Sequence, residues 1–338
     1  MNINSAPRIG INGFGRIGFC ALRLCVQKGF PVVAINASRT AEQIGRLFLH
    51  DTVHRSFDGT VTWDGDDDLF VNGSHIKITH ERDPKEIPWK ELEVEFVIEC
   101  TGQFLTTEKA NAHLIAGAKK VIMSAPPKDD TPMFVMGVNE ETYSPSMRIV
   151  SNASCTTNCL APLAKIVNDS FGIESGLMTT VHAMTSKQNA IDGFNAKDRR
   201  IARSGDNIIP STTGAAKAVG KVIPELKGKL TGISMRVPVL DGSVVDLSVN
   251  LKKATDYDSI CSAIREASET TMKGIVSYIT DPLVSCDFIG NICTCNFDAD
   301  AGLAITPTFV KLIAWYDNEM AYTSQLLNLA RYMYLLEQ

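Results

Sequence analysis

Short apolar runs alternate with amphipathic stretches over the first 150 residues of the chain. Apolar and β-branched residues dominate four runs that predict strands, at 8–11, 32–36, 95–99 and 120–123. Helical spacing follows the first run, with Ile17, Ala21 and Leu22 near one face, and returns at 108–116. Strands that alternate with helices are typical of an α/β domain with a mostly parallel sheet.

The pattern changes after residue 149. A short strand at 149–151 leads into a helix from Cys155 to about Val167, with Ser154 as its N-cap and a kink at Pro162. Further along, we expect a strand at 177–185, a helix at 215–221 and a strand-like segment around Arg236. The length of 338 residues favours two domains.

Composition excludes several classes of protein. Hydrophobic residues make up 44% of the chain and charged residues 21%, as in ordinary globular proteins. The net charge of -5 gives no general attraction to nucleic acid. No window approaches the roughly 20 apolar residues of a membrane span, and the N-terminus lacks a signal-peptide pattern. We therefore expect a cytoplasmic protein whose nine cysteines are reduced, without a zinc-type metal site.

A glycine-rich turn follows the first strand. Gly13, Gly15 and Gly18 match G-x-G-x-x-G between a predicted strand and a predicted helix, which is the setting of a dinucleotide site. Gly13 permits the tight turn, Gly15 lets backbone approach a pyrophosphate, and Gly18 lets the helix pack on the strand. The helix N-terminus supplies free N–H groups. The alternative is a tight turn that binds no ligand.

The second strand ends without the acid that usually binds the ribose of NAD. The segment reads Asn36-Ala37-Ser38-Arg39, so a 2′-phosphate meets no carboxylate repulsion there. Ser38 and Arg39 would bind such a phosphate, which predicts that NADP is accepted. The alternative is that Arg39 is a solvated surface charge and NAD binds without the acid contact.

Cys155 lies in the polar stretch SNASCTTNC, in the first turn of its predicted helix, where the dipole favours a thiolate. Lowering a thiol pKa by ~2 units takes ~2.7 kcal/mol, more than a helix end supplies, so a cationic imidazole is wanted nearby. His182, in a strand-like run, is the best candidate, although a lone histidine in a strand is usually structural. The other histidines, 50, 54, 75, 80 and 113, lie in polar or surface-like contexts, and Cys159 is expected to pack.

Two features suit phosphate groups. A basic cluster, Arg199-Arg200-Ile201-Ala202-Arg203, lies in a long loop, and Thr213-Gly214 opens a helix, where anions bind well. Arg236 is a charge within a strand-like segment. Such a residue pairs with an acid in a structural role or with a phosphate in a functional one.

The motifs together resemble the glyceraldehyde-3-phosphate dehydrogenase family over nearly the whole chain. The resemblance is carried by INGFGRIG, ECTG, SAPPKDD, SNASCTTNC, TVHAMT, the run from IIPSTTGAAKAV to MRVPV, and WYDNEMAY. It implies a Rossmann-type doubly wound dinucleotide-binding domain, 1–154 plus 319–338, the latter a C-terminal helix packing back. It also implies an α+β catalytic domain, 155–318, with a mixed or antiparallel sheet.

The resemblance implies oxidative phosphorylation of D-glyceraldehyde 3-phosphate to 1,3-bisphosphoglycerate with NAD or NADP. Cys155 would be the nucleophile, forming a hemithioacetal and then a thioester, and His182 the base. Residues implied to bind the two phosphates are Ser154, Thr156, Thr185, Arg200, Thr213, Gly214 and Arg236. Those implied to contact the cofactor are Gly13, Gly15, Arg16, Ile17, Gly18, Ser38, Arg39, Arg82, Ser124 and Asn318.

Departures from the family pattern bear on the cofactor and on neighbouring subunits. Ala37 replaces the usual Asp, which agrees with NADP acceptance, and Phe19 replaces an Arg. Lys187, Phe194 and Met320 are further departures. The family is usually a homotetramer, in which the loop 186–209 reaches a neighbour's cofactor. Erythrose-4-phosphate dehydrogenase is the alternative activity on the same fold.

Overall fold

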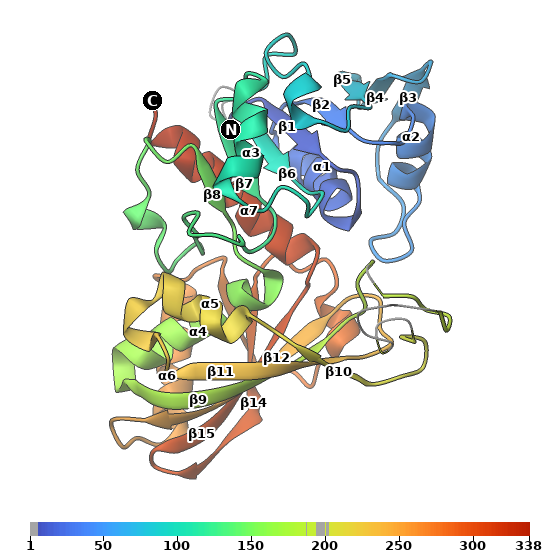
Figure 1. The fold of residues 1–338 in the computed structure, drawn as a ribbon. Helices are drawn as coiled ribbons and strands as arrows, with labels where there is room; N and C mark the ends of the chain where they lie inside the picture. Colours follow the sequence, from blue (N-terminus) through green and yellow to red (C-terminus); the bar gives the residue numbers. More distant parts are fainter. Residues whose placement is uncertain (1–5, 187, 194–199, 201–202) are drawn as a thin grey trace. The chain divides into compact units, whose positions relative to one another are not determined.

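A computed structural model describes residues 6–186, 188–193, 200 and 203–338. The chain forms two compact units (Figure 1). The first comprises the residues up to 134, 140–153 and 323–338, and the second comprises 135–139 and 154–322. The sequence placed the corresponding boundaries at 154/155 and at 319.

The first unit is built on a sheet of eight strands within the described residues. The strands are β1 (Ile9–Asn12), β2 (Val32–Asn36), β3 (Val61–Asp64), β4 (Asp68–Val71), β5 (Ser74–Thr79), β6 (Phe96–Glu99), β7 (Lys120–Met123) and β8 (Ile149–Ser151). They lie in the order β3-β4-β5-β2-β1-β6-β7-β8. The six from β5 to β8 pair in parallel, whereas β3 and β4 extend the sheet as antiparallel strands. The expected mostly parallel sheet is confirmed, and the antiparallel extension was not predicted.

Helices and turns connect these strands. They are α1 (Arg16–Lys28), α2 (Ala41–Leu49), α3 (Thr107–Ile115), the short 3-10 helices Pro84–Glu86 and Glu140–Thr142, and most of α7 (Met320–Leu335). Within the first unit, α7 is bound to α1, since Lys28 Nζ donates to Ser324 Oγ at 2.7 Å and Arg331 donates to the Lys28 carbonyl at 3.1 Å. The C-terminal segment therefore belongs to the core of this unit.

The central strands are buried on both faces, as in a sheet covered by helices. A cluster of apolar side chains, including Trp89, Val97 and Val121, fills the space beside α3. His113 on α3 is fully buried beside this cluster, so its surface-like interpretation from the sequence was wrong. The surrounding sequence is polar, but helical spacing turns position 113 inward with Ala110.

The glycine turn between β1 and α1 has three distinct requirements. Gly13 has φ +94°, in the left-handed region that favours glycine. A Cβ added to Gly18 would lie 2.1 Å from the Gly13 carbonyl oxygen, so only hydrogen fits there. A Cβ added to Gly15 would meet nothing within 4 Å. Folding therefore requires glycine at 13 and 18, whereas position 15 faces open space.

The second unit has a sheet of seven strands among its described residues, in the order β10-β11-β9-β12-β15-β14-β13. They are β9 (Ile173–His182), β10 (Ile209–Thr212), β11 (Leu230–Arg236), β12 (Ser243–Leu251), β13 (Val276–Ile279), β14 (Cys295–Thr306) and β15 (Phe309–Tyr316). Parallel and antiparallel pairs both occur, as expected for a mixed sheet.

The helices α4 (Cys155–Phe171), α5 (Ala215–Val222) and α6 (Tyr257–Glu269) cover one face of this sheet, and 3-10 helices form at Pro224–Leu226 and Ser285–Phe288 (Figure 1). No described helix covers the opposite face. Leu177, Ile233, Leu303 and Ile305 are exposed on strands there, between 48% and 67%. In the same sheet, β12 and β15 alternate between buried and accessible positions, which is the pattern of a sheet covered on one side.

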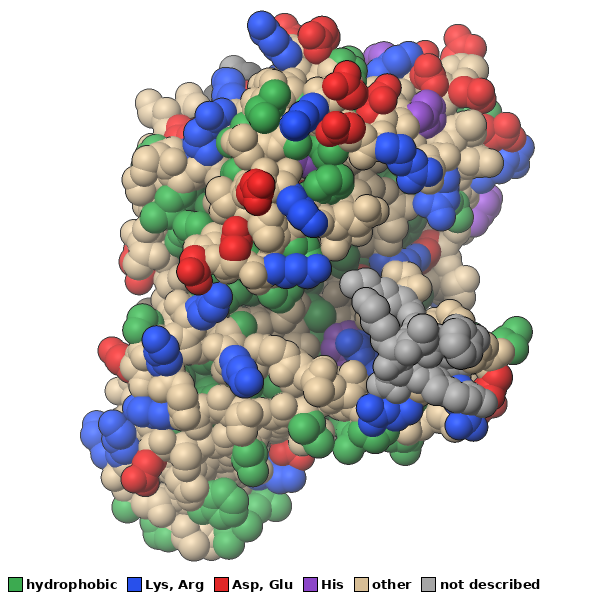
Figure 2. Space-filling view, viewed as in Figure 1, with side chains coloured by type: hydrophobic (Ala, Val, Ile, Leu, Met, Phe, Trp, Pro, Cys, Tyr) green, Lys and Arg blue, Asp and Glu red, His purple; other side chains and the backbone are tan. Residues whose placement is uncertain are grey.

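The surface gives few other indications of partners. Figure 2 shows acidic and basic side chains interspersed over the face in view, in keeping with the small net charge. Within the described residues, none of the helices combines the length and apolar character that crossing a bilayer would need.

The glycine geometry yields a paired prediction. Gly18→Ala should lower the free energy of unfolding by about 2–3 kcal/mol, because its Cβ collides with backbone that cannot move away. Gly15→Ala should leave the melting temperature nearly unchanged but weaken NAD binding, since its methyl group projects into open space before α1. Thermal unfolding and NAD titration measure the two effects. Equal melting temperatures for the two variants would contradict the steric argument.

Candidate active site

Cys155 is the first residue of α4, and the local chain positions it tightly. Ser154 caps the helix, its Oγ accepting the Thr157 N–H at 3.1 Å, as the sequence predicted. Ala153 just before it is buried and has φ +57°, an uncommon conformation for a residue with a Cβ. The sharp entry turn places Cys155 at the N-terminal end of the helix, where the dipole favours negative charge.

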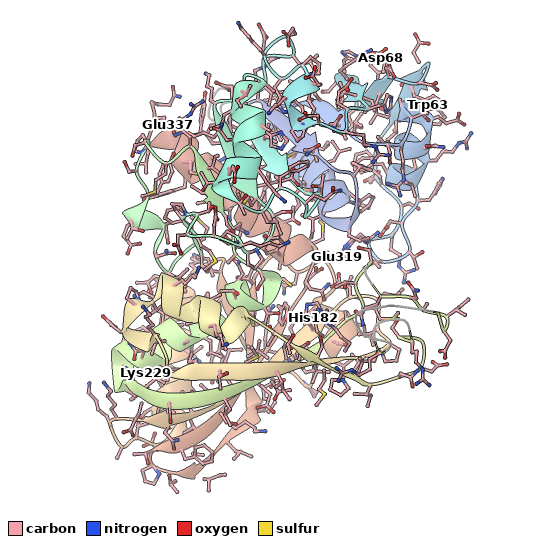
Figure 3. The ribbon with its side chains drawn as sticks, viewed as in Figure 1. Trp63, Asp68, His182, Lys229, Glu319 and Glu337 are labelled. Atoms are coloured by element: carbon pink, nitrogen blue, oxygen red, sulfur yellow. The ribbon has the colours of Figure 1, made fainter. Side chains whose placement is uncertain are left out.

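His182 is the partner of Cys155. It is the last residue of β9 (Figure 3), and its Nε2 lies 3.4 Å from the Cys155 Sγ. The His182 Nδ1 lies 2.7 Å from the carbonyl oxygen of Ala183. A carbonyl oxygen only accepts, so this contact favours the proton on Nδ1, whereas the Arg236 Nη1, 2.5 Å from the same Nδ1, only donates and favours the other tautomer. With the proton on Nδ1, the Nε2 lone pair faces the thiol, which is the arrangement of a general base beside its nucleophile.

Arg236 lies directly across from His182, because β11 pairs in parallel with β9 and joins these two residues in register. The Arg236 Nη1 donates to the Ala183 carbonyl at 3.0 Å and also lies 2.5 Å from the His182 Nδ1. The guanidinium therefore adds a permanent positive charge to the site. It favours a thiolate at Cys155 and opposes protonation of the imidazole.

Burial dominates the ionisation of this pair. Burial raises the pKa of the Cys155 thiol above its usual value, and the charge of Arg236 and a hydrogen bond from the Thr156 backbone offset this only in part. Burial and then Arg236 lower the pKa of His182 to about 3. Both shifts favour the neutral forms and argue against the expected imidazolium beside a thiolate, and Arg236 is the cation that favours the thiolate.

The predicted phosphate residues of the second unit surround two helix ends. Gly214 is the N-cap of α5 without a side-chain cap, and the Thr213 Oγ1 accepts the Ala215 N–H at 3.2 Å. Thr156 is buried and its hydroxyl contacts the Tyr316 hydroxyl at 2.9 Å. Thr185 lies three residues after His182 and is exposed, and its backbone N–H donates to the Gln188 side chain.

Some predicted positions fall in or beside the part of the chain that is not described. Arg200 is exposed and flanked by such residues, so its place at a phosphate stays a prediction. Arg199, Lys187 and Phe194 lie outside the described residues. Among the other departures, Phe19 packs edge-on against Phe48, and Met320 is buried.

Tyr316 is a site residue that the sequence analysis missed. Its hydroxyl contacts both the Thr156 and Thr180 hydroxyls, at 2.9 and 2.8 Å, and its ring meets the His182 ring edge-on at 5.9 Å. Tyr316 thus joins α4 to β9 directly beneath the Cys155–His182 pair. The sequence analysis singled out Asn318, two residues further on, but gave Tyr316 no role.

Asn318 is held in one orientation by the second unit. The Ser243 Oγ accepts the Ala183 N–H at 3.0 Å and donates to the Asn318 Oδ1 at 2.7 Å. Because this hydroxyl donates to Oδ1, the amide NH2 of Asn318 points away from Ser243. The same chain of contacts connects Asn318 to the residue that follows His182.

In the first unit, several predicted cofactor residues lie around the glycine turn. Gly15 is the N-cap of α1 and has no side-chain cap, so the first N–H groups of α1 lack a capping side chain. The Arg16 side chain turns away to pair with Asp51, which leaves its backbone to the turn. Arg39 is exposed and donates to the Phe14 carbonyl at 3.0 Å. Ser38 and Arg82 are exposed, and Ser124 is half-buried just after β7.

Asp241 is a buried acid beside Asn318. Its Oδ1 accepts the N–H groups of Gly242 and Asn318, at 2.7 and 3.1 Å. Burial and the neighbouring acids Asp317 and Glu319 raise the pKa of Asp241 to about 9. Asp317 accepts three backbone N–H groups, at 2.6–2.7 Å. The raised pKa favours the protonated form of Asp241 at pH 7.

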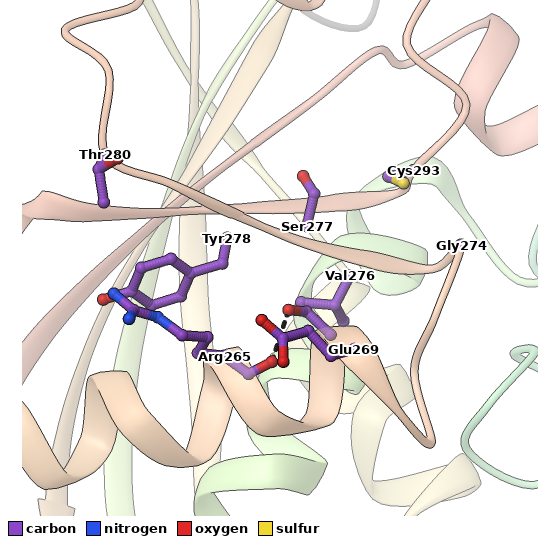
Figure 4. Close-up of a pocket in the computed structure, with 9 residues that line it drawn as sticks. Arg265, Glu269, Gly274, Val276, Ser277, Tyr278, Thr280 and Cys293 are labelled. Carbon is purple, nitrogen blue, oxygen red and sulfur yellow. Dashed lines mark hydrogen bonds between the residues drawn. The ribbon is translucent and has the colours of Figure 1, made fainter.

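A separate pocket lies between α6 and β13. It has a volume of about 550 Å³, and Arg265 lies over the Tyr278 ring at 4.4 Å on one side of it (Figure 4). None of the described residues that line it is a predicted site residue. It therefore takes no part in the chemistry around Cys155.

The ionisation of Asp241 predicts how stability depends on pH. The unfolded carboxyl loses its proton near pH 4, whereas the folded one keeps it to about pH 9. Folding thus retains a proton in this window, and the free energy of unfolding falls as pH rises through it, by at most about 1.4 kcal/mol per pH unit. Asp241→Asn should remove this slope. The difference in melting temperature between the variant and the original protein should therefore shift in favour of the variant from pH 5 to pH 8. A variant that melts lower than the original protein at pH 8 would contradict this assignment.

Comparisons with known proteins agree with this geometry. Residues 7–107 match the model for the NAD binding domain of glyceraldehyde 3-phosphate dehydrogenase, and residues 154–318 match that for its C-terminal domain. Glyceraldehyde-3-phosphate dehydrogenase 1 of Mucor circinelloides f. lusitanicus is 56% identical over 95% of this chain and 96% of its own. Glyceraldehyde-3-phosphate dehydrogenase A of Escherichia coli (strain K12) is 52% identical over 95% and 97%. The chain belongs to the glyceraldehyde-3-phosphate dehydrogenase family.

Proposed function

We propose that this protein oxidises and phosphorylates D-glyceraldehyde 3-phosphate to 1,3-bisphosphoglycerate with NAD, through a thioester on Cys155. The observation that carries the proposal is the 3.4 Å contact between the Cys155 Sγ and the His182 Nε2, with Arg236 beside it. A reactive thiol, a base in the correct tautomer and a fixed cation are what such an oxidation needs. The relatives reported above carry the name of this activity, so the erythrose 4-phosphate alternative has no support.

The first unit fits the pyrophosphate of NAD. The backbone at Gly15 faces open space, and the α1 N-terminus lacks a side-chain cap that would compete with an anion. Gly13, Gly18 and the backbone of Arg16 and Ile17 would form the cradle. When bound, NAD supplies a hydride acceptor.

The residues around Cys155 account for each proton. The neutral His182 accepts the thiol proton as the sulfur attacks the aldehyde carbon and gives it to the carbonyl oxygen, so that a hemithioacetal forms on Cys155 and His182 is again neutral. His182 next takes the hemithioacetal hydroxyl proton while hydride leaves the carbon, which gives a thioester. Inorganic phosphate then attacks the thioester carbonyl, the bond to sulfur breaks, and the acyl phosphate leaves with Cys155 regenerated.

The phosphate groups of the reaction need separate anion sites. We assign the phosphate of the triose to Arg236 and Thr185. We assign the attacking inorganic phosphate to residues near the N-termini of α4 and α5, with Arg200 close by. These residues are Ser154, Thr156, Thr213 and Gly214. Arg236 would then change partners when substrate binds, which relieves the charge that opposes protonation of His182.

We further propose that the protein accepts NADP as well as NAD. Arg39 donates one N–H to the Phe14 carbonyl of the glycine turn, which anchors its exposed guanidinium beside Ser38. The remaining N–H groups and the Ser38 hydroxyl would bind a 2′-phosphate, and no carboxylate stands at the end of β2.

Self-association to a homotetramer is supported by the uncovered face of the second sheet. Leu177 and Ile233 are exposed on the adjacent strands β9 and β11, and Leu303 and Ile305 on β14 of the same sheet, and a second copy would cover apolar side chains of this kind. Light scattering that returned the mass of a single chain would refute this.

The thioester mechanism predicts the effect of removing the nucleophile. Cys155→Ser should lower triose-phosphate oxidation at least about a thousand-fold while NAD still binds, because a hydroxyl is far less nucleophilic than a thiol. Cys286→Ser is the matched control, since Cys286 is exposed and outside the site. Without phosphate or arsenate, the unsubstituted protein should form about one NADH per subunit and then stop. Sustained NADH formation without phosphate would contradict the thioester.

The cofactor proposal predicts a selective loss. The unsubstituted protein should use NADP with a kcat/KM within about a hundred-fold of that for NAD. A wider gap, above ~2.7 kcal/mol, would sink the proposal. Arg39→Gln should lower the efficiency with NADP at least about ten-fold and change that with NAD less than about three-fold. Arg46→Gln, an exposed arginine on α2, serves as the control and should change neither.

A further inference from the structure

A line of polar side chains crosses the carboxyl ends of four parallel strands in the first unit. Thr79, Asn36, Asn12 and Glu99 are the last residues of β5, β2, β1 and β6, and each pairs in register with the next. Asn12, Asn36 and Glu99 are between 0% and 6% exposed. Buried polar groups at this edge need hydrogen-bond partners, and they supply them to one another.

The direction of hydrogen bonding starts at Trp89. Its indole N–H can only donate, and it lies 3.1 Å from the His113 Nδ1. His113 Nδ1 must therefore accept, which leaves the proton on Nε2. That Nε2–H donates to the Glu99 Oε2 at 3.1 Å. His113 is thus a neutral donor whose tautomer is set by Trp89.

Glu99 receives donors at both oxygens. Its Oε2 also accepts from the Asn12 Nδ2 at 2.6 Å, and its Oε1 accepts from the Thr101 N–H at 2.6 Å and from the Thr101 hydroxyl. Four donors converge on the carboxylate, two at each oxygen. Glu99 and the His113 side chain are both fully buried.

The carboxylate fixes two amides in turn. Because the Asn12 Nδ2 faces Glu99, the Asn12 Oδ1 faces β2 and accepts from the Asn36 Nδ2 at 2.8 Å. The Asn36 Oδ1 then accepts from the Thr79 hydroxyl and the Glu81 N–H, each at 2.9 Å. The orientation imposed at β6 is carried across three strands without interruption.

The far end of the line supports the segment after β2. The Ala37 N–H donates to the Thr79 carbonyl at 2.9 Å, and the Gly13 N–H donates to the Asn36 carbonyl at 2.8 Å. Ala37 is followed by Ser38 and Arg39, and Gly13 opens the glycine turn. The line therefore ends where both predicted parts of the dinucleotide site begin.

We propose that Glu99 is a positioning residue for the cofactor: its buried carboxylate orients Asn12 and Asn36 and so holds the glycine turn and the 37–39 segment in their binding geometry. The inference rests on the proposed binding of NAD over this edge of the sheet. Glu99 does not itself touch the cofactor in this scheme, and it acts through the two asparagines.

Glu99→Gln tests the proposal because the amide cannot satisfy the same donors. Placed at Oε1, its NH2 group meets the Thr101 N–H, and placed at Oε2 it meets the His113 Nε2–H and the Asn12 NH2. In the second placement, the Asn12 side-chain amide must turn over, and the Asn36 amide must turn with it. We expect the Kd and the KM for NAD to rise at least about ten-fold, with kcat at saturating NAD within about three-fold of the original.

Glu95→Gln is the matched control. Glu95 lies just before β6, at its amino end, and binds the Arg8 N–H and Lys119 instead. It should leave the Kd for NAD unchanged. Asn36→Ser is the second variant, should E99Q not fold. It breaks the line while Glu99 keeps its four donors, and it too should weaken NAD binding at least about five-fold.

The outcomes separate the possibilities. If E99Q folds and binds NAD within two-fold of the original protein, or if N36S does, the proposal is overturned. A loss of kcat without a change in KM or Kd would also overturn it, because it would place the effect on the chemistry. A failure of the proposed function shows itself differently, since the unsubstituted protein and E95Q would then not bind NAD.

Discussion

The contact between Cys155 and His182 depends on a balance between burial and one fixed charge. Burial disfavours both the thiolate and the imidazolium, whereas Arg236 favours the first and opposes the second. The pair is therefore neutral at rest and ready to separate charge when an aldehyde accepts the sulfur. Tyr316, Thr156 and the strand register of β9 and β11 all serve to keep this pair at 3.4 Å.

Two buried carboxyl groups, Glu99 and Asp241, have different kinds of neighbours in this fold. Glu99 is surrounded by N–H and O–H donors, two at each oxygen. Burial and the neighbouring acids Asp317 and Glu319 raise the pKa of Asp241, which favours its protonated form. The difference lies in the partners rather than in the depth of burial, since both side chains are nearly inaccessible.

Much of the first unit could be predicted from the sequence because its signals are local. The strands at 32–36, 120–123 and 149–151 appear with the predicted bounds, since each is a short apolar run between helices. The antiparallel β3 and β4 were missed because partly exposed strands carry a weaker pattern. His113 was misread because polar neighbours on a helix do not reveal which face a side chain occupies.

The site was only partly predictable for a related reason. Cys155, His182 and Arg236 stood out as unusual residues in their surroundings, but their distances depend on the pairing of β9 with β11, which is a long-range contact. Their ionisation depends on burial, which no motif states. Tyr316, Ser243 and Asp241 act through contacts between segments far apart in the chain, and the sequence analysis gave none of them a role.

The line of side chains from Thr79 to Glu99 has a consequence for exchanging parts between relatives. A graft that moves only the residues after β2 into another dinucleotide-binding protein would leave behind the amide that orients them. Asn12, Asn36, Thr79 and Glu99 come from strands up to 87 positions apart, yet they form one hydrogen-bonded unit. To transfer cofactor preference in such a fold, these four strand-end residues should therefore be exchanged together with the loop after β2.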